Sequence, residues 1–501
     1  MSSDTPRRSS HNTLASVDQD SKSLECKTLT TSTSLTAASL AVPPSSSPSQ
    51  PKIAPPIPPV KYSKRFRAKN DPDVARARAI YFRAYASGMG LVILSIFAIF
   101  TIYWGSLWKV PAHSLQGWVV DFDGGEVGQY VVSELSAINN PVMHWNVVSS
   151  DVFGDVEGVI DALRDDKSWA AVIINPGASA RLADSIASPN DAYQGTDAIS
   201  VYAVEARNEQ AYRNFIRPAA QASLEVIKAK FTIMLAGRLA SAGNLGSILS
   251  TSPQTLVEPL GYRLVNIIPF NQPVASAVAF VGLIYLLILA FFIVMIAHGA
   301  REASGINRML GCGSLIRVRL VSCLVGYFFL SFFYSLLNLA FKLDLTRRYG
   351  HGGFLVFWML NWIGMLAVGM ALESMITILT PRYIPFFMLL WIITNVSVCV
   401  FPIDMLPKIY RYGYAVPFYN ISNSIRSIAF GTKDTRSYHF RHYIQITADY
   451  HNPVGLNFGV LFAWVLLSCI TLPLLQWYVR RRDDRTETVN TLPVINPKES
   501  A

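Results

Sequence analysis

Four polar side chains stand inside long apolar stretches, where any chemistry within a membrane would need them. Glu373 is the most deeply placed carboxylate, and Asn338, Asn361 and Asn395 are amides in comparable surroundings. Ionisable groups at membrane depth are costly and usually face a bundle interior or a cavity. Glu373 would then couple protons, contact a cationic substrate, or serve as a structural anchor. The three amides are candidates for a substrate path or for hydrogen bonds between helices.

The chain lacks the motifs that assemble catalytic or cofactor-binding side chains. There is no His-Glu-x-x-His, no Gly-x-Ser-x-Gly and no glycine-rich phosphate loop. Asp121 and Asp123 follow a strand-like run, where they would form a turn; two carboxylates are too few for a calcium site. None of the five cysteines belongs to a Cys-x-x-Cys pair. We therefore expect no catalytic residue, no metal, no cofactor and no enzymatic activity.

The elements that must position these side chains are membrane helices. About 20 consecutive apolar residues in helical form cross a bilayer core, and 51% of the chain is hydrophobic. Six stretches qualify: 88–108, 274–297, 315–341, 354–379, 383–401 and 456–479. The sequence thus predicts a polytopic α-helical membrane protein with six transmembrane helices.

Lys and Arg near the ends of these stretches predict the orientation, because such residues favour the cytoplasmic side. Eight basic residues lie between Lys61 and Arg83, and Arg480–Arg482 follow the last stretch. With six crossings these segments share one side, so both termini are expected to be cytoplasmic. The net charge of +10 then reflects juxtamembrane segments near anionic lipid rather than nucleic-acid binding.

Residues 109–273 are expected to form an extracytoplasmic α/β domain between the first and second transmembrane helices. They carry 17 acidic and 11 basic residues, a net charge of −6, and no cysteine. Short apolar runs typical of strands, including 118–122 and 170–174, alternate with segments of helical spacing. A mostly polar segment over 209–240 predicts a long helix that would stand off the membrane as a stalk.

The remaining segments are connections and tails. Residues 1–60 are rich in Ser, Thr and Pro, which predicts a disordered cytoplasmic tail, followed by a basic juxtamembrane segment (61–87). The loop 402–455 contains Pro417 and Arg426 in a run whose isoleucines share one helical face, as in an interfacial helix. Asn420 starts a glycosylation sequon on the expected extracytoplasmic side. Residues 480–501 would form a second cytoplasmic tail.

Four stretches together are similar to a known family: GWVVDFDGG (117–125), WAAVIINPGASARL (169–182), YAVPFYNISNSIRSIAFGT (414–432) and LNFGVLFAW (456–464). They resemble the fungal nitrosoguanidine-resistance membrane proteins over about residues 70–480. More remotely, the chain is similar to the membrane domains of ABC-2-type exporters and to bacterial phage-infection proteins. The resemblance implies an architecture and a link to resistance against toxic compounds.

The leading hypothesis is a permease or export factor for lipophilic small molecules or lipids. The alternative is a non-transporting membrane scaffold or regulator of lipid distribution and stress response. Membrane lipids and a lipophilic small molecule are the expected partners, and a homodimer is left open. Nucleic acid is not expected, and nothing in the sequence supports a separate ATPase subunit. The long third stretch favours the plasma membrane.

Overall fold

The computed structural model describes residues 65–241, 243–432 and 453–491; the predicted disordered tail over 1–60 lies outside this range. The described residues are mostly helical and contain one five-stranded sheet. Five of their helices are long and apolar enough to cross a membrane: Pro72–Leu107, Pro273–Ala303, Cys312–Ala340, Thr346–Val396 and Val454–Arg485. The protein is therefore a helical membrane protein with a separate α/β region.

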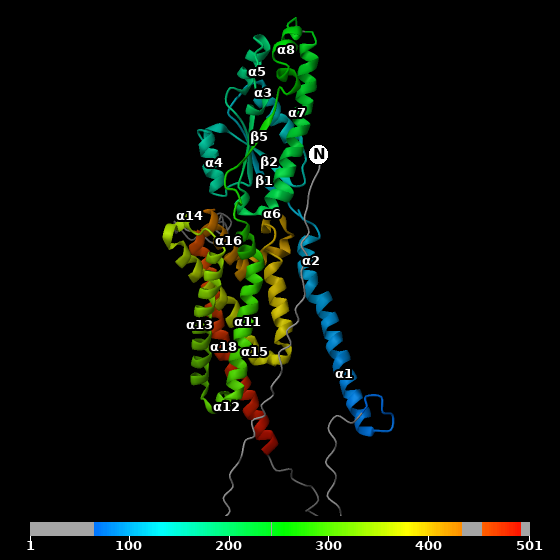
Figure 1. The fold of residues 1–501 in the computed structure, drawn as a ribbon, viewed down its shortest axis with the longest axis vertical. Helices are drawn as coiled ribbons and strands as arrows, with labels where there is room; N and C mark the ends of the chain where they lie inside the picture. Colours follow the sequence, from blue (N-terminus) through cyan, green and yellow to red (C-terminus); the bar gives the residue numbers. More distant parts are fainter. Residues whose placement is uncertain (1–64, 242, 433–452, 492–501) are drawn as a thin grey trace, which may run out of the picture. The chain divides into compact units, whose positions relative to one another are not determined.

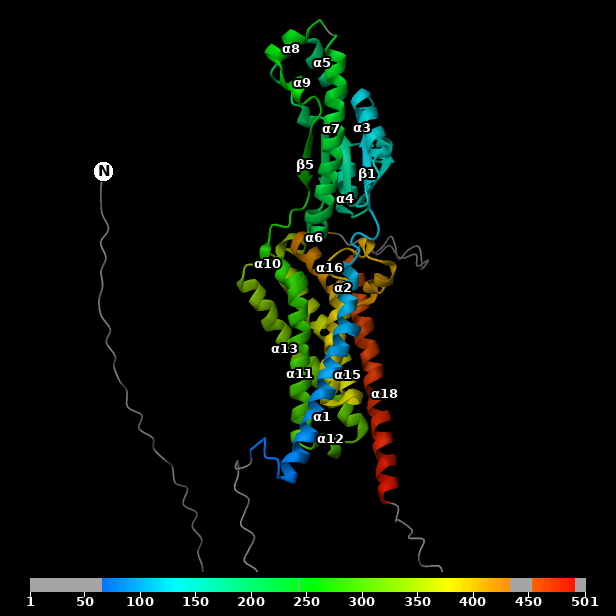
Figure 2. The ribbon, with the colours of Figure 1, turned by 90° about the vertical axis from the view of Figure 1, so that its right-hand side faces the viewer.

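These apolar segments are built from several helices (Figures 1 and 2). The first joins α1 (Pro72–Ser95), a π-helical turn (Ile96–Phe100) and α2 (Thr101–Leu107), and the second joins α10 (Pro273–Ser276), a π-helical turn (Ala277–Val281) and α11 (Gly282–Ala303). The other helices outside the α/β region are α12 (Ile306–Met309), α13 (Cys312–Ala340), α14 (Thr346–Tyr349), α15 (Gly353–Val396), α16 (Pro417–Phe430) and α18 (Pro453–Thr491). α15 lies at the centre, since 67% of its segment's most apolar window is buried, against 6% for the first segment.

The fourth and fifth predicted membrane helices together form α15, which folds back on itself. Thr380 has φ 62° and ψ 163°, outside the helical region, and Pro381 follows it. In the first arm, Gly364 lies against Ile421 of α16. In the second arm, Asn395 Oδ1 accepts a hydrogen bond from the backbone N–H of Phe418 in the same helix, at 3.1 Å. A straight helix would separate Gly364 from Asn395 by about 47 Å, so α15 is a hairpin.

The α/β region contains β1 (Leu115–Asp121), α3 (Glu126–Ala137), β2 (Met143–Val148), α4 (Val156–Arg164), β3 (Ala170–Ile174), α5 (Ala178–Ala187), β4 (Ile199–Ala203), α6 (Glu209–Ala211), a π-helical turn (Tyr212–Ile216), α7 (Arg217–Leu239), α8 (Leu245–Thr251), α9 (Gln254–Val257) and β5 (Tyr262–Asn266). The sheet order is β2-β1-β3-β4-β5, and β4 runs antiparallel to β3. β3 lies in the middle with all five residues buried, as its continuous apolar run predicts.

Helices cover both faces of this sheet. Val159 and Leu163 of α4 pack on one face, and α3, α5 and α7 pack on the other. The helix predicted over 209–240 forms as α6, the π-helical turn and α7, but it does not stand free as a stalk. Its inner face, which includes Leu224, Ile227 and Phe231, is buried in the core on that side of the sheet.

Candidate functional site

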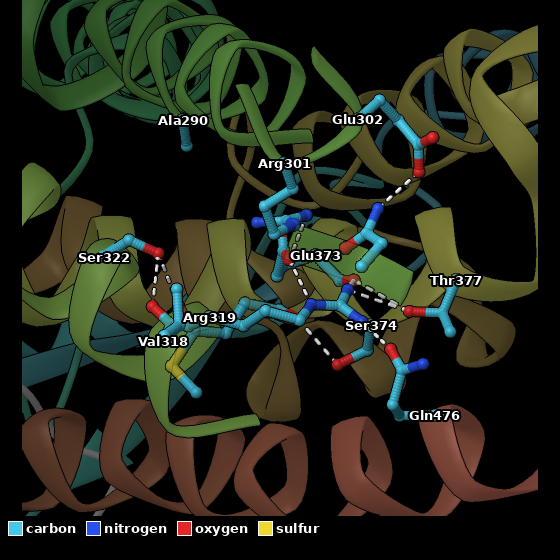
Figure 3. A network of polar contacts seen from close by, with 12 residues as sticks. Ala290, Arg301, Glu302, Val318, Arg319, Ser322, Glu373, Ser374, Thr377 and Gln476 are labelled. Atoms are coloured by element: carbon cyan, nitrogen blue, oxygen red, sulfur yellow. Dashed lines mark hydrogen bonds and ion pairs between the residues drawn. The ribbon is translucent and has the colours of Figure 1, made fainter. Parts of the chain in front are cut away.

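Glu373 lies at the centre of an ionic cluster that joins four helices (Figure 3). Its Oε1 atom accepts hydrogen bonds from Arg301 of α11 at 2.8 Å and from Arg319 of α13 at 2.6 Å. Arg319 also donates to the Glu373 backbone carbonyl, to Thr377 Oγ1 and, at 2.5 Å, to Gln476 Oε1 of α18. We call Arg301, Arg319 and Glu373 the ionic cluster. It is buried, with the Glu373 side chain 1% exposed.

The cluster fits the anchoring role that the sequence left open for Glu373. A buried charge is tolerated when it is paired and hydrogen-bonded, and one carboxylate here holds two guanidinium groups from neighbouring helices. One atom is left over, because Glu373 Oε2 is buried with no hydrogen-bond partner. The sequence did not predict that the two arginines pair with Glu373. The position of Arg319 inside the predicted third span is the feature that indicates a buried partner.

The buried face of α13 carries hydroxyl, amide, guanidinium or thiol groups along most of its length. Six of its seven buried residues recur at intervals of three or four positions: Arg319, Cys323, Tyr327, Ser331, Ser335 and Asn338. We call these six residues the α13 polar face. It extends about 29 Å, close to the thickness of a bilayer hydrocarbon core. The opposite face is apolar and exposed, with Val325, Phe329 and Phe333 among its residues. α13 is thus polar toward the protein and apolar toward the lipid.

The structure does not gather the four predicted path residues into one site. Asn361 donates to Ser335 of α13 at 3.0 Å, so it meets the α13 polar face close to Asn338. Asn338 donates to the Tyr334 carbonyl of its own helix. Glu373 lies 12 positions beyond Asn361, about 18 Å along the same arm. Asn395 belongs to the other arm, where it binds α16.

A second buried ion pair connects the α/β region to the helices. Arg426 of α16 donates to Glu209 at the start of α6 and to the Ala206 carbonyl. Burial alone would raise the pKa of Glu209, but the charge and hydrogen bond of Arg426 outweigh it and hold that pKa below its ordinary value. Asn208 also donates to the Val400 carbonyl. These contacts attach α6 to α16 directly.

Two sequence-based assignments around α16 need correction, the interfacial helix and the glycosylation candidate. The helix is not interfacial, since twelve of its fourteen residues are buried, Arg426 among them. Pro417 takes the first helical position, where its missing N–H has no cost. Asn420 is fully buried, and its Nδ2 donates to the Val416 carbonyl at 2.7 Å. The folded protein therefore has no room for a glycan on this side chain.

In the α/β region, Asp123 occupies the place where such folds usually bind ligands. The crevice beyond β1 and β3, where the strand order reverses, is the common ligand site of open α/β sheets. Here the Asp123 carboxylate accepts from the N–H groups of Gly125 and Gly128 at the start of α3, and from Ser179 N and Oγ in α5. Asp123 therefore caps two helices, in keeping with the turn-forming role predicted for it. No group of three metal-ligating side chains occurs among the described residues.

The chain is similar both to a protein family and to a yeast protein. A model of the family described as "Protein of unknown function (DUF3533)" matches residues 89–440. An uncharacterized endoplasmic reticulum membrane protein of Saccharomyces cerevisiae is 26% identical over 424 residues, which cover 78% of this chain and 79% of the yeast protein. The residues that the family model matches include the ionic cluster, the α13 polar face and α16.

Proposed function

We propose the following function for this chain, which belongs to the DUF3533 family and is a membrane protein. The proposed activity is the movement of lipids or lipid-like lipophilic compounds across the membrane, in the manner of a permease or export factor. One observation carries it, the α13 polar face. A helix that is polar inside and apolar outside borders a polar route when it separates from its neighbours, while apolar tails remain in the bilayer.

We further infer six crossings, because α15 folds back at Thr380 and a mostly apolar run of 20 residues or more lies on each side of the fold, over 353–379 and over 381–401. Arg301, Arg308, Arg317 and Arg382 then lie at the same end as α12, which makes that end cytoplasmic. The α/β region would face the opposite side. The name of the yeast relative favours the endoplasmic reticulum over the plasma membrane that span length suggested. Movement down a gradient needs no ATPase, in keeping with the absence of its motifs.

The experiment is reconstitution of the purified protein into liposomes that contain fluorescent phospholipids, with a membrane-impermeant quencher added outside. We expect quenching of inner-leaflet lipid to exceed that of empty liposomes. Ser331→Ala combined with Ser335→Ala should slow it, because alanine removes the hydroxyls without adding bulk at these buried positions. The control, Val325→Leu combined with Phe329→Leu, changes the lipid-facing side of α13 and should have no effect.

The proposal fails if the protein moves no lipid in liposomes and if deletion of the gene leaves drug and fluorescent-lipid accumulation unchanged. A non-transporting scaffold is the second candidate. The scaffold is favoured by Arg319, because all three of its guanidinium nitrogens donate hydrogen bonds to protein acceptors, as expected for a permanent contact between helices. Normal lipid movement in the absence of the gene, together with altered abundance of neighbouring membrane proteins, would favour the scaffold.

A further inference from the structure

The ionic cluster contains more positive than negative charge. Two guanidinium groups share one carboxylate, and both arginines bind the same oxygen, Oε1. His298 and Glu302 are the other titratable groups on this end of α11; Glu302 is exposed and accepts a hydrogen bond from Asn307. α13 contributes Cys323 and Tyr327, and α18 contributes Gln476, none of which adds a negative charge at neutral pH. Among the residues that the structure describes, one positive charge of the cluster therefore has no buried counter-charge.

Arg301 is the arginine of the cluster whose guanidinium N–H groups are mostly not used in hydrogen bonds to the described part of the protein. The guanidinium of Arg319 is engaged by four acceptors. Within the described residues, Arg301 makes one side-chain hydrogen bond, to Glu373, and its side chain is 7% exposed. A guanidinium offers five N–H donors, so most of those on Arg301 remain for another ligand. Arg301 also lies in the last turn of α11, at the edge of the apolar segment.

We propose that the ionic cluster binds the phosphate of an anionic lipid headgroup through Arg301, with Glu373 as an internal competitor. The inference takes from the proposed function the premise that the bundle handles lipids, and it names their class. A guanidinium binds phosphate through two parallel hydrogen bonds. The Glu373 carboxylate holds Arg301 through one oxygen only and leaves the other without a partner. A phosphate oxygen pair is therefore the better ligand for Arg301.

The test is a binding titration of the full chain in detergent, followed by thermal unfolding. The probes are a short-chain phosphatidic acid, a short-chain phosphatidylcholine and inorganic phosphate. We expect phosphatidic acid to raise the unfolding temperature and phosphatidylcholine to have little effect. Arg301→Gln should weaken phosphatidic acid binding roughly tenfold, equivalent to one charge-assisted contact. Glu373→Gln should strengthen it, because the competitor loses its charge.

Arg317→Gln is the matched control, since Arg317 is an exposed arginine at the same end of the bundle. It should bind phosphatidic acid like the unmodified protein. Arg301→Lys keeps the charge without the fork and should give intermediate affinity, which keeps the test decisive if Glu373→Gln fails to fold. Unchanged binding by Arg301→Gln, or an equal loss in Arg317→Gln, would overturn the proposal. Preference for inorganic phosphate would overturn the lipid assignment.

The outcome also separates this inference from the proposed function. Binding that depends on Arg301, without any lipid movement in liposomes, supports the binding site and contradicts transport. Movement of phosphatidylcholine and phosphatidic acid at equal rates, unaffected by Arg301→Gln, supports transport and contradicts the site.

Discussion

Arg426 and Glu209 show how much can depend on one pair of side chains. Both are buried, and they come from segments 217 positions apart in the sequence. A buried ion pair adds little over an apolar pair of similar size, whereas the loss of one partner leaves an uncompensated charge. The pair therefore makes the junction between α6 and α16 selective for its correct partners.

Replacement of Arg426 alone should strongly destabilise the protein. We expect Arg426→Met to cost about 3–5 kcal/mol, because Glu209 stays buried without its cation. The double variant Arg426→Met with Glu209→Met should recover most of that loss. Denaturant unfolding in detergent, monitored by tryptophan fluorescence, measures both. Equal stability of the single and double variants would contradict the assigned pairing.

The same junction should weaken in acid. Burial would raise the pKa of Glu205, but hydrogen bonds from Phe270 N, Arg213 and Asn266 hold it below its ordinary value, and the pKa of Glu209 is lowered as well. A carboxylate with a lowered folded pKa adds stability above its unfolded pKa of about 4.3. That stability is lost as pH falls toward the folded pKa.

The measurement is the unfolding temperature between neutral pH and about pH 3. We expect it to be nearly constant above about pH 5 as far as these two groups are concerned, and to fall below that. Glu209→Gln should flatten the decline, since glutamine does not titrate. A decline of the same slope in this variant would assign the acid sensitivity to other carboxylates.

At the residue scale, the sequence predicted the kind of site better than its partners. The apolar surroundings of Glu373 were enough to predict an anchor or a ligand, because a lone buried carboxylate is costly. Arg301 and Arg319 sit near span ends, where an arginine equally suits the membrane surface, so their pairing was not predictable. Asn420 matched the sequon, but burial of its amide follows only from tertiary packing.

At the scale of elements, Asp123 links its own βα unit to a second one, through Ser179, which lies 56 positions later in the sequence. One carboxylate satisfies N–H groups at the start of both α3 and α5. An aspartate that caps a helix contributes about 1 kcal/mol, and Asp123 serves two helices. This shared cap also uses N–H groups at two helix starts, which are groups that could otherwise bind a phosphate.

Loss of this shared cap should cost more than loss of an ordinary one. We expect Asp123→Ala to destabilise the α/β region by about 2 kcal/mol, the sum of two caps. Asp155→Ala is the control, because Asp155 caps only α4 through the Gly158 N–H at 2.8 Å, and it should cost about 1 kcal/mol. Limited proteolysis of the full chain reports both, and equal susceptibility of the two variants would argue against the double role.

The elements themselves were predictable to different degrees. β3 forms at the residues predicted, 170–174, because a central strand that is covered on both faces is apolar on both faces. β5 was missed, since Tyr262–Asn266 is a short edge strand in which only Leu264 and Val265 are aliphatic. The hairpin of α15 follows from two apolar runs and Pro381. The sequence does not predict that both arms of this hairpin contact the same turn of α16, because that depends on contacts between residues far apart in the sequence.

At the scale of the molecule, the proposed topology places the α/β region in the lumen or outside the cell. Asn190 is exposed there, and Ala192→Thr would complete an Asn-x-Thr sequon at that site. We expect this variant to acquire a glycan that endoglycosidase removes, and the unmodified protein to acquire none at Asn420. Electrophoretic mobility measures both.

The matched control is Ala192→Val, which has no sequon. A glycan on Asn420, removed by Asn420→Gln, would contradict the buried position of this side chain. Absence of a glycan on the Ala192→Thr variant would contradict the orientation. Composition alone does not predict whether Asn190 or Asn420 can carry a glycan. Charge bias indicates on which side of the membrane a loop lies, but not whether one asparagine side chain is exposed.

The place of β5 in the sheet has a consequence for biosynthesis. This edge strand ends at Asn266, shortly before α10 begins at Pro273. The sheet is therefore incomplete until the chain has been synthesised almost to its second membrane helix. The hydrogen bonds of Glu205 with Asn266 and Phe270 form no earlier than that. Under the proposed topology, the α/β region would cross the membrane before its sheet is complete. Completion of the sheet would then coincide with membrane entry of the next helix.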